Sequence, residues 1–210
     1  MKKSLSLYYL FWIFIIGCIF GWFVEGVFSL IKWKMFINHS AVVIGPFNVA
    51  YGLGAMMLSA LLYKFEDEKC WKIFIISFIG GSILEYIMSW GMEFILGFTA
   101  WDYSRKPLNL NGRICVRYSL FWGLLGIIWI KCFYPYIIKF IDKIDKKIGK
   151  KLAIFLTIFL VFDTILTFIA IDRARAKEKG VEAKYSYEEV LDKTFNKDYL
   201  KNMFNNRWGD

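Results

Sequence analysis

A row of small and acidic residues inside a long apolar segment constrains this chain most. Residues 71–96 are otherwise dominated by Ile, Leu, Phe, Met and Trp. Within and just after them, six residues recur at every fourth position: Ser77, Gly81, Glu85, Ser89, Glu93 and Gly97. On a helix this spacing forms one slowly winding stripe. Because a carboxylate among lipid tails costs at least about 2.5–3.5 kcal/mol, the stripe is expected to face protein or water. The segment predicts a membrane protein with a polar interior.

The amount of apolar sequence agrees with this prediction. Hydrophobic residues make up 58% of the 210 residues, which is too much apolar surface for one water-soluble core of this size. Runs long enough to span a bilayer, about 17–25 residues, occur at 8–31, 47–63, 71–96, 116–138 and 152–171. We therefore predict an all-α, polytopic integral membrane bundle of about five transmembrane helices. The second run is the shortest and begins just after Gly45-Pro46, which is typical of a helix start.

The domain organisation follows from where the apolar runs stop. We predict a transmembrane helical domain over residues 1–171 and a soluble or interfacial tail over residues 172–210. Apolar residues in the tail recur at spacings typical of one or two short amphipathic helices that dock on a membrane or on loops.

Several signatures of other protein classes are missing from the sequence. The four cysteines have no paired metal or redox spacing, and the single histidine, His39, has no neighbouring ligand. No metal or cofactor is therefore predicted. The sequence contains no phosphate-binding G-x-x-x-x-G-K-[ST] motif, so this chain carries no ATPase motif. The net charge of +9 lies in loops beside membrane helices, where it favours membrane lipids as partners and not nucleic acid.

The unusual polar residues are expected to gather on one side of the membrane. The first and third helices run in the same direction, and Glu25 and Glu93 each lie in the later third of their helix, so both approach the side that carries loop 97–117. Glu85 lies deeper, near the middle of the membrane. We predict a polar cavity here, with no catalytic residue assigned. Its candidate lining residues are Glu25, Asn48, Tyr51, Glu85, Ser89, Glu93, Trp101, Asp102, Tyr103, Asn109 and Arg113.

Each candidate also has a purely structural interpretation. Arg113 is expected to pair with Asp102 or Glu93, because an arginine fork binds carboxylates well and an unpaired acid there is costly. Glu85 and Glu93 either form such structural pairs or contact a substrate or proton. Glu25 continues a row of small residues, which favours helix packing with a hydrogen bond as its role. Trp101 and its neighbours are also explained as an interfacial anchor.

These residues carry a family resemblance over nearly the whole chain. The motifs are Gly-Pro-Phe-Asn-Val-Ala-Tyr-Gly-Leu-Gly at 45–54, the three glutamates Glu25, Glu85 and Glu93, Trp-Asp-Tyr-Ser at 101–104, Asn109, and Gly112-Arg113. Together they resemble the bacterial membrane family named putative ABC-transporter type IV, or putative ABC transporter permease. The tail at 186–208 resembles that family's carboxy-terminal segment. The resemblance implies a multi-pass transport protein of a bacterial inner (plasma) membrane.

Three classes of function follow from these observations. In the first, the chain is a permease-like transport component, working with a separate ATPase subunit or as a homo-oligomer. In the second, the same acids form an intramembrane active site for a lipid-linked substrate, although the sequence lacks a nucleophile with its base or a set of metal ligands. In the third, the polar stripes bind partner helices in a membrane assembly or regulatory subunit.

Overall fold

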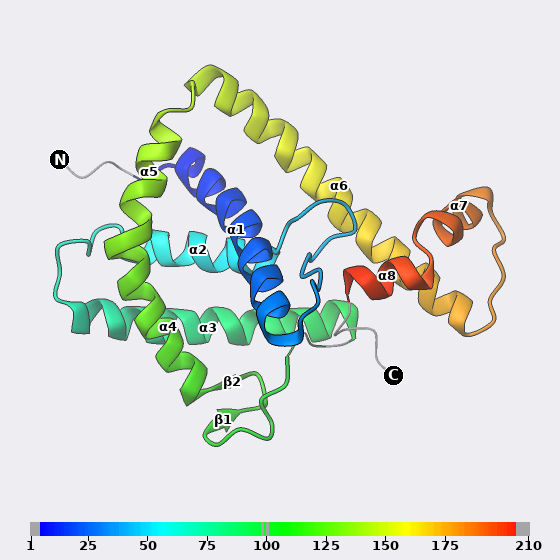
Figure 1. The fold of residues 1–210 in the computed structure, drawn as a ribbon, viewed down its shortest axis with the longest axis horizontal. Helices are drawn as coiled ribbons and strands as arrows, with labels where there is room; N and C mark the ends of the chain where they lie inside the picture. Colours follow the sequence, from blue (N-terminus) through cyan, green and yellow to red (C-terminus); the bar gives the residue numbers. More distant parts are fainter. Residues whose placement is uncertain (1–4, 98, 100, 205–210) are drawn as a thin grey trace. The chain divides into compact units, whose positions relative to one another are not determined.

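The computed structural model describes residues 5–97, 99 and 101–204. It is 73% helical with almost no strand, which confirms the predicted all-α class. The elements in chain order are α1 (Leu7–Trp33), α2 (Val49–Leu62), α3 (Cys70–Leu96), β1 (Asn109–Leu110), β2 (Ile114–Cys115), α4 (Val116–Ile128), η1 (Trp129–Phe133), α5 (Tyr134–Asp142), α6 (Lys146–Glu178), α7 (Ser186–Thr194) and α8 (Lys197–Met203) (Figure 1).

Four stretches of the described chain are long and apolar enough to cross a membrane: Leu7–Trp33, Cys70–Ile95, Val116–Asp142 and Lys146–Glu178. They coincide with the first, third, fourth and fifth predicted spans. The second predicted span, 47–63, forms α2, an apolar helix of 14 residues. Its length falls below the roughly 17 residues that a bilayer core requires. The helix begins at Val49, two residues after the start of the predicted span. The preceding N–H group, that of Asn48, donates to the Cys18 carbonyl of α1 at 3.1 Å and is not part of the helix.

The fourth membrane stretch contains a π-helical turn between two α-helical parts. Pro135 lies at the start of α5 and lacks an N–H, so the preceding turn loses one helical hydrogen bond. The wider η1 turn absorbs this loss, with the Tyr134 N–H donating to the Trp129 carbonyl. Two side chains of η1 fix it from outside: the Trp129 indole donates to the Ser59 hydroxyl at 2.9 Å, and Lys131 donates to the carbonyl of Glu66.

By internal packing the chain divides into two compact units. The first unit contains residues 1–17 and 50–150, and the second contains residues 18–49 and 151–210. This division is based on packing, whereas the predicted boundary at residue 171 separates a membrane domain from a tail outside it. That boundary stays a prediction. Each unit is described by itself below.

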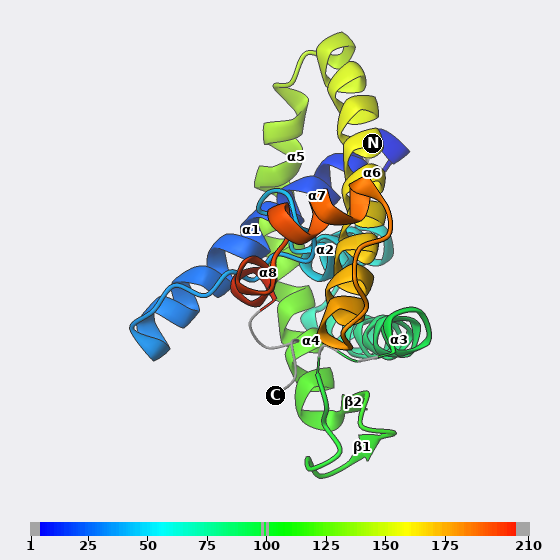
Figure 2. The same cartoon turned by 90° about the vertical axis from the view of Figure 1, so that its right-hand side faces the viewer.

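In the first unit, α3 and α4 cross (Figure 2). Their close approach depends on glycines, each of which lies against a large side chain of the other helix. A Cβ atom added at Gly81 would overlap the base of the Trp122 side chain, and one at Gly123 would overlap the Phe74 ring. The small residues of the stripe on α3 therefore contact the helix that follows the loop.

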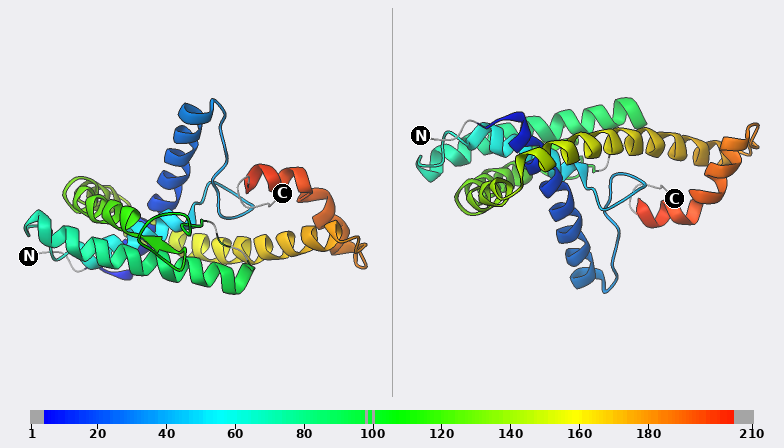
Figure 3. Two further views of the ribbon diagram at one scale, coloured as in Figure 1. Left: turned by 90° about the horizontal axis from the view of Figure 1, so that it is seen from below. Right: turned by 90° about the horizontal axis from the view of Figure 1, so that it is seen from above.

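In the second unit, a loop packs between α6 and the tail. The hydrophobic core of this unit consists of Val43, Ala170, Ile171, Leu200, Met203 and Phe204. Helices α7 and α8 fold back beside the carboxyl end of α6, as Figures 1 and 3 show. The Arg173 guanidinium donates to both carboxylate oxygens of Asp192, each at 3.0 Å, and so fixes α7 to α6. The tail is thus helical, as predicted.

Candidate functional site

A short hairpin precedes α4 and shapes the loop of residues 101–113. Strands β1 and β2 pair antiparallel with Leu110 opposite Ile114. The turn between them contains Asn111 and Gly112, both with positive φ (53° and 67°), a conformation that favours glycine and asparagine. The Asn109 side chain stabilises the turn: its amide oxygen accepts from the Gly112 N–H at 3.0 Å, and its amide nitrogen donates to the Lys106 carbonyl at 2.8 Å. Asn109 is exposed and organises the loop.

Asp102 is also used inside this loop. Its carboxylate accepts from the Ser104 N–H at 2.8 Å and from the Ser104 hydroxyl at 2.9 Å. The bond from the Ser104 N–H holds the pKa of Asp102 below its usual range. A side chain at Gly112 would collide with this carboxylate, since an added Cβ would lie 2.8 Å from its Oδ1. Asp102 therefore fixes the loop's shape and is not the partner of Arg113.

Glu85 is buried in the middle of α3, with 8% of its surface exposed. Two neutral donors bind its carboxylate: the Tyr103 hydroxyl at 2.8 Å and the Trp122 indole N–H at 3.1 Å. One donor comes from the loop and the other from α4. Within the described residues no lysine or arginine forms an ion pair with Glu85. Its carboxyl group is therefore hydrogen-bonded but has no cationic partner among those residues.

Tyr103 is held over Glu85 by aromatic stacking. Its ring lies parallel to that of Tyr118, with centroids 4.5 Å apart and an interplanar angle of 16°, and its N–H donates to the Gly112 carbonyl at 2.7 Å. Burial, and then the charge of Glu85, raise the pKa of Tyr103. The phenol therefore stays protonated and remains a donor.

Glu93 lies two turns further along α3 and pairs with Arg113. This is one of the two partners expected for Arg113. The guanidinium also lies over the Tyr86 ring, 5.5 Å from its centroid. The Trp101 indole donates to the Arg113 carbonyl at 2.9 Å, so the loop fixes the arginine backbone. Helix α3 ends directly afterwards at Gly97 (φ 70°), whose N–H caps the Glu93 carbonyl at 2.9 Å.

Ser89 lies between the two glutamates, four residues from each. It is 1% exposed, and its hydroxyl has no hydrogen-bond partner in the part of the chain that the structure describes. A buried hydroxyl without a partner is uncommon, because its desolvation is not compensated. Ser89 is therefore a polar group that a ligand or water could satisfy.

The structure brings eight of the eleven candidates into one region of the first unit: Glu85, Ser89, Glu93, Trp101, Asp102, Tyr103, Asn109 and Arg113. Tyr51 lies in the same unit on α2 and is exposed. Glu25 and Asn48 belong to the second unit. A space shared by Glu25 and Glu93 therefore stays a prediction.

Sequence reasoning missed Trp122, Tyr118 and Tyr86. A signal for Trp122 existed, because Ser119, Trp122 and Gly126 follow one another at spacings of three and four along α4. That pattern places the indole on the helix's small-residue face.

The helices and the polar interior of the first unit define an α-helical membrane protein with several membrane-length segments. The chain belongs to the family described as "Putative ABC-transporter type IV", whose model matches residues 12–168. The family and the apolar helices fit a multi-pass membrane protein of transport type. Neither the curated proteins nor the solved structures include a match to the chain.

Proposed function

We propose that this chain is the permease-like membrane component of a transporter in a bacterial cell membrane, and that Glu85 lines its substrate path. One observation carries the proposal. Glu85 is buried on a membrane-length helix and is bound by neutral donors only, from Tyr103 and Trp122, within the described residues. Ionisable groups at such depth are costly and mark substrate or ion pathways in membrane proteins.

A comparison of Glu85 with Glu93, the next acid on α3, supports different roles for the two residues. Arg113 pairs with Glu93 near the end of α3, while Glu85 has no cationic partner within the described residues. A positively charged or polar solute would supply the missing charge or hydrogen bonds at Glu85. Ser89, whose hydroxyl has no partner within the described residues, lies next on the same face and would accept or donate one more hydrogen bond.

Loop 101–113 would form the mouth of this path. Tyr103 reaches Glu85 from the loop, so a solute that approaches Glu85 from that side has to replace or bend this hydrogen bond. The stacked ring of Tyr118 gives the displaced Tyr103 an aromatic surface along which to slide. Trp101 and Asp102 keep the remaining loop in one shape.

The energy source would lie outside this chain. The sequence has no phosphate-binding motif, so the proposal includes a separate ATPase subunit as partner, with membrane lipids around the apolar helices. The family to which the chain belongs favours such a partner.

Thiol accessibility tests whether water and ions reach Glu85. In a background in which the two exposed cysteines, Cys70 and Cys132, are replaced by serine, Ser89→Cys is reacted in native membranes with small, membrane-impermeant thiol reagents. We expect a cationic reagent to react faster than an anionic one of the same size. Adding Glu85→Gln should abolish this preference, because the attracting charge is lost.

Ile87→Cys is the matched control on the same helix. Ile87 is 55% exposed on the outer face of α3, which is expected to contact lipid, so the thiol of this variant should not react with either impermeant reagent. If the Ser89→Cys thiol reacts as slowly as the Ile87→Cys thiol, or shows no preference for the cationic reagent, the basis for the proposed path is removed.

A further inference from the structure

Asp163 is a second buried acid, on α6, that the proposed transport site does not use. It is the one charged residue between Lys151 and Asp172 in the sequence, and its exposed fraction is 0%. Its Oδ1 accepts one hydrogen bond, from the Ile44 N–H at 3.1 Å. Its Oδ2 has no hydrogen-bond partner among the described residues.

The surroundings of Asp163 are polar but offer it no counter-charge within the described chain. The loop of residues 38–48 presents backbone groups to α6. Thr167, one turn along α6, accepts from the Val43 N–H at 2.9 Å and donates to the Asp163 carbonyl at 2.7 Å. The titratable group that faces Asp163 from α8 is Tyr199, whose hydroxyl donates to the Val43 carbonyl at 2.7 Å. No lysine or arginine of the described chain pairs with Asp163.

A carboxylate in this position would be costly. An ionised group without a counter-charge and with one of its oxygens unsatisfied loses its hydration and recovers little of it. A neutral carboxyl group keeps the bond from the Ile44 N–H and removes most of that cost. The docked loop is therefore compatible with a protonated Asp163 and much less compatible with an ionised one.

We propose that Asp163 is a proton-binding site that controls the docking of residues 40–47 on α6. With the loop docked, Oδ2 takes a proton from the aqueous phase and forms an O–H bond. When the loop separates from α6, that bond breaks, the proton returns to water and the hydrated carboxylate remains. Docking is thus linked to the uptake of one proton. The inference rests on the second unit alone and is independent of the proposed role of Glu85.

Hydrogen exchange of residues 40–47 in lipid nanodiscs tests this linkage. Exchange rates are measured for the wild type and for Asp163→Asn at each pH. The wild-type rate is divided by the rate of the variant, which cancels the intrinsic effect of pH on exchange. Asparagine keeps an acceptor for the Ile44 N–H but cannot titrate. One linked proton makes the ratio rise by about tenfold per pH unit once the carboxyl begins to ionise. A constant ratio between about pH 4 and about pH 9 would overturn the proposal.

Two further variants separate proton binding from simple docking. Thr167→Val removes the acceptor of the Val43 N–H, and Tyr199→Phe removes the donor to its carbonyl. Both should speed exchange of the loop by a factor that does not change with pH. If Asp163→Asn fails to fold, Glu85→Gln is decisive, because it removes the other buried acid of the described residues: its infrared spectrum in membranes must contain the carbonyl band of a protonated, buried carboxyl group at acidic pH. Absence of that band refutes the proton site.

Discussion

Within the described residues, each unit holds a buried acid on a membrane-length helix and an acid that is paired with arginine. In the first unit these are Glu85 and the Glu93–Arg113 pair, and in the second they are Asp163 and the Asp192–Arg173 pair. Each arginine pair involves a residue near the carboxyl end of α3 or α6. The buried acids lie deeper and have no such partner within the described residues.

The buried acids differ in how completely their oxygens are satisfied. Glu85 accepts from two side chains that come from separate elements. Asp163 accepts from one backbone N–H, and its second oxygen is unsatisfied within the described chain. Glu85 therefore helps to hold a loop and two helices together in the charged or neutral form, whereas Asp163 is destabilised whenever it ionises. Depth alone does not decide the role of an acid in a membrane helix; the number of donors does.

The largest expected effect is the difference in stability between two single variants, in each of which one buried acid is replaced by leucine. Glu85→Leu leaves the Tyr103 hydroxyl and the Trp122 N–H without an acceptor, and each unsatisfied donor costs about 1–3 kcal/mol, so we expect a loss of about 2–6 kcal/mol in unfolding free energy. Asp163→Leu removes a costly carboxyl group and leaves a single N–H unpaired, so it should stay within about 1 kcal/mol of wild type. Denaturation of the purified protein in mixed micelles measures both. Equal losses at the two positions would contradict the comparison.

A smaller loss is expected from disturbing the helix crossing that positions Trp122. In Gly81→Ala the added methyl group meets the Cβ and Cγ atoms of Trp122, which cannot move unless α4 shifts. We expect a loss of about 1–3 kcal/mol in unfolding free energy. Gly91→Ala on the same helix is the control. An added Cβ there has nothing within 4 Å, so the better helix former should stabilise by up to about 1 kcal/mol. A neutral Gly81→Ala would show that the crossing is looser than described.

Much of α3 and its polar face could be predicted from the sequence, because the signals for them are local and periodic. The four-residue spacing from Ser77 to Glu93 requires one helix face, and the cost of a carboxylate in lipid requires that face to be covered. Charge and the position of Arg113 in the loop beside the end of α3 predicted a pairing with Asp102 or Glu93, and in the structure the partner is Glu93. These inferences depend on near neighbours and on a strong energetic penalty.

The remaining features depend on contacts between distant segments, which periodicity does not contain. Nothing local in residues 38–48 indicates that Ile44 donates to Asp163, more than a hundred residues later. Asn109 and Asp102 are candidate cavity residues by their polarity alone, and the structure adds that both form hydrogen bonds inside the loop of residues 101–113. The late start of α2 likewise follows from a bond between Asn48 and Cys18. Composition cannot distinguish a polar group that shapes a loop from one that contacts a solute.

The third prediction compares the arginine pair of the tail with an exposed acid nearby. The hydrogen bonds from Arg173 hold the pKa of Asp192 below its usual range. A lowered pKa in the folded state stabilises docking of α7 above the ordinary aspartate value, about 3.9, and this stabilisation is lost as the pH falls through the lowered pKa. Hydrogen exchange of residues 186–194 should therefore accelerate below about pH 4 in wild type, relative to Asp192→Asn at the same pH.

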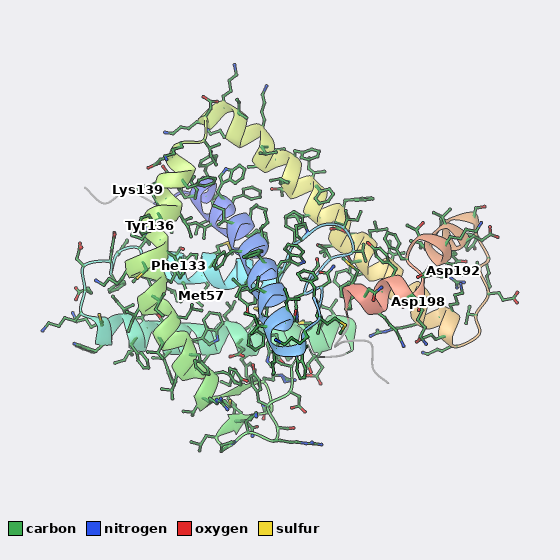
Figure 4. All side chains as sticks on the ribbon, in the orientation of Figure 1. Met57, Phe133, Tyr136, Lys139, Asp192 and Asp198 are labelled. Atoms are coloured by element: carbon green, nitrogen blue, oxygen red, sulfur yellow. The ribbon has the colours of Figure 1, made fainter. Side chains whose placement is uncertain are left out.

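Asp198 provides the control for this measurement. It lies on α8 close in sequence to Asp192, and both are labelled in Figure 4. Asp198 is exposed. Asp198→Asn should leave the acid-induced change of residues 186–194 as it is in wild type. If Asp192→Asn shows the same acid-induced acceleration as wild type, the Arg173 pair is not what holds α7.

The smallest effect is expected at the Glu93–Arg113 pair. The Glu93 side chain is 53% exposed and that of Arg113 is 17% exposed, so water and salt screen the attraction. Arg113→Ala should therefore cost about 1 kcal/mol of unfolding free energy, far less than the loss of a fully buried pair. Arg113→Lys should recover part of it, because an ammonium keeps the charge but not the fork that reaches Glu93 while lying on Tyr86. The difference between wild type and Arg113→Ala should shrink as salt is added. A loss of several kcal/mol that salt does not change would mean that this pair is buried like Glu85, and the contrast between paired boundary acids and unpaired deep acids would fail in the first unit.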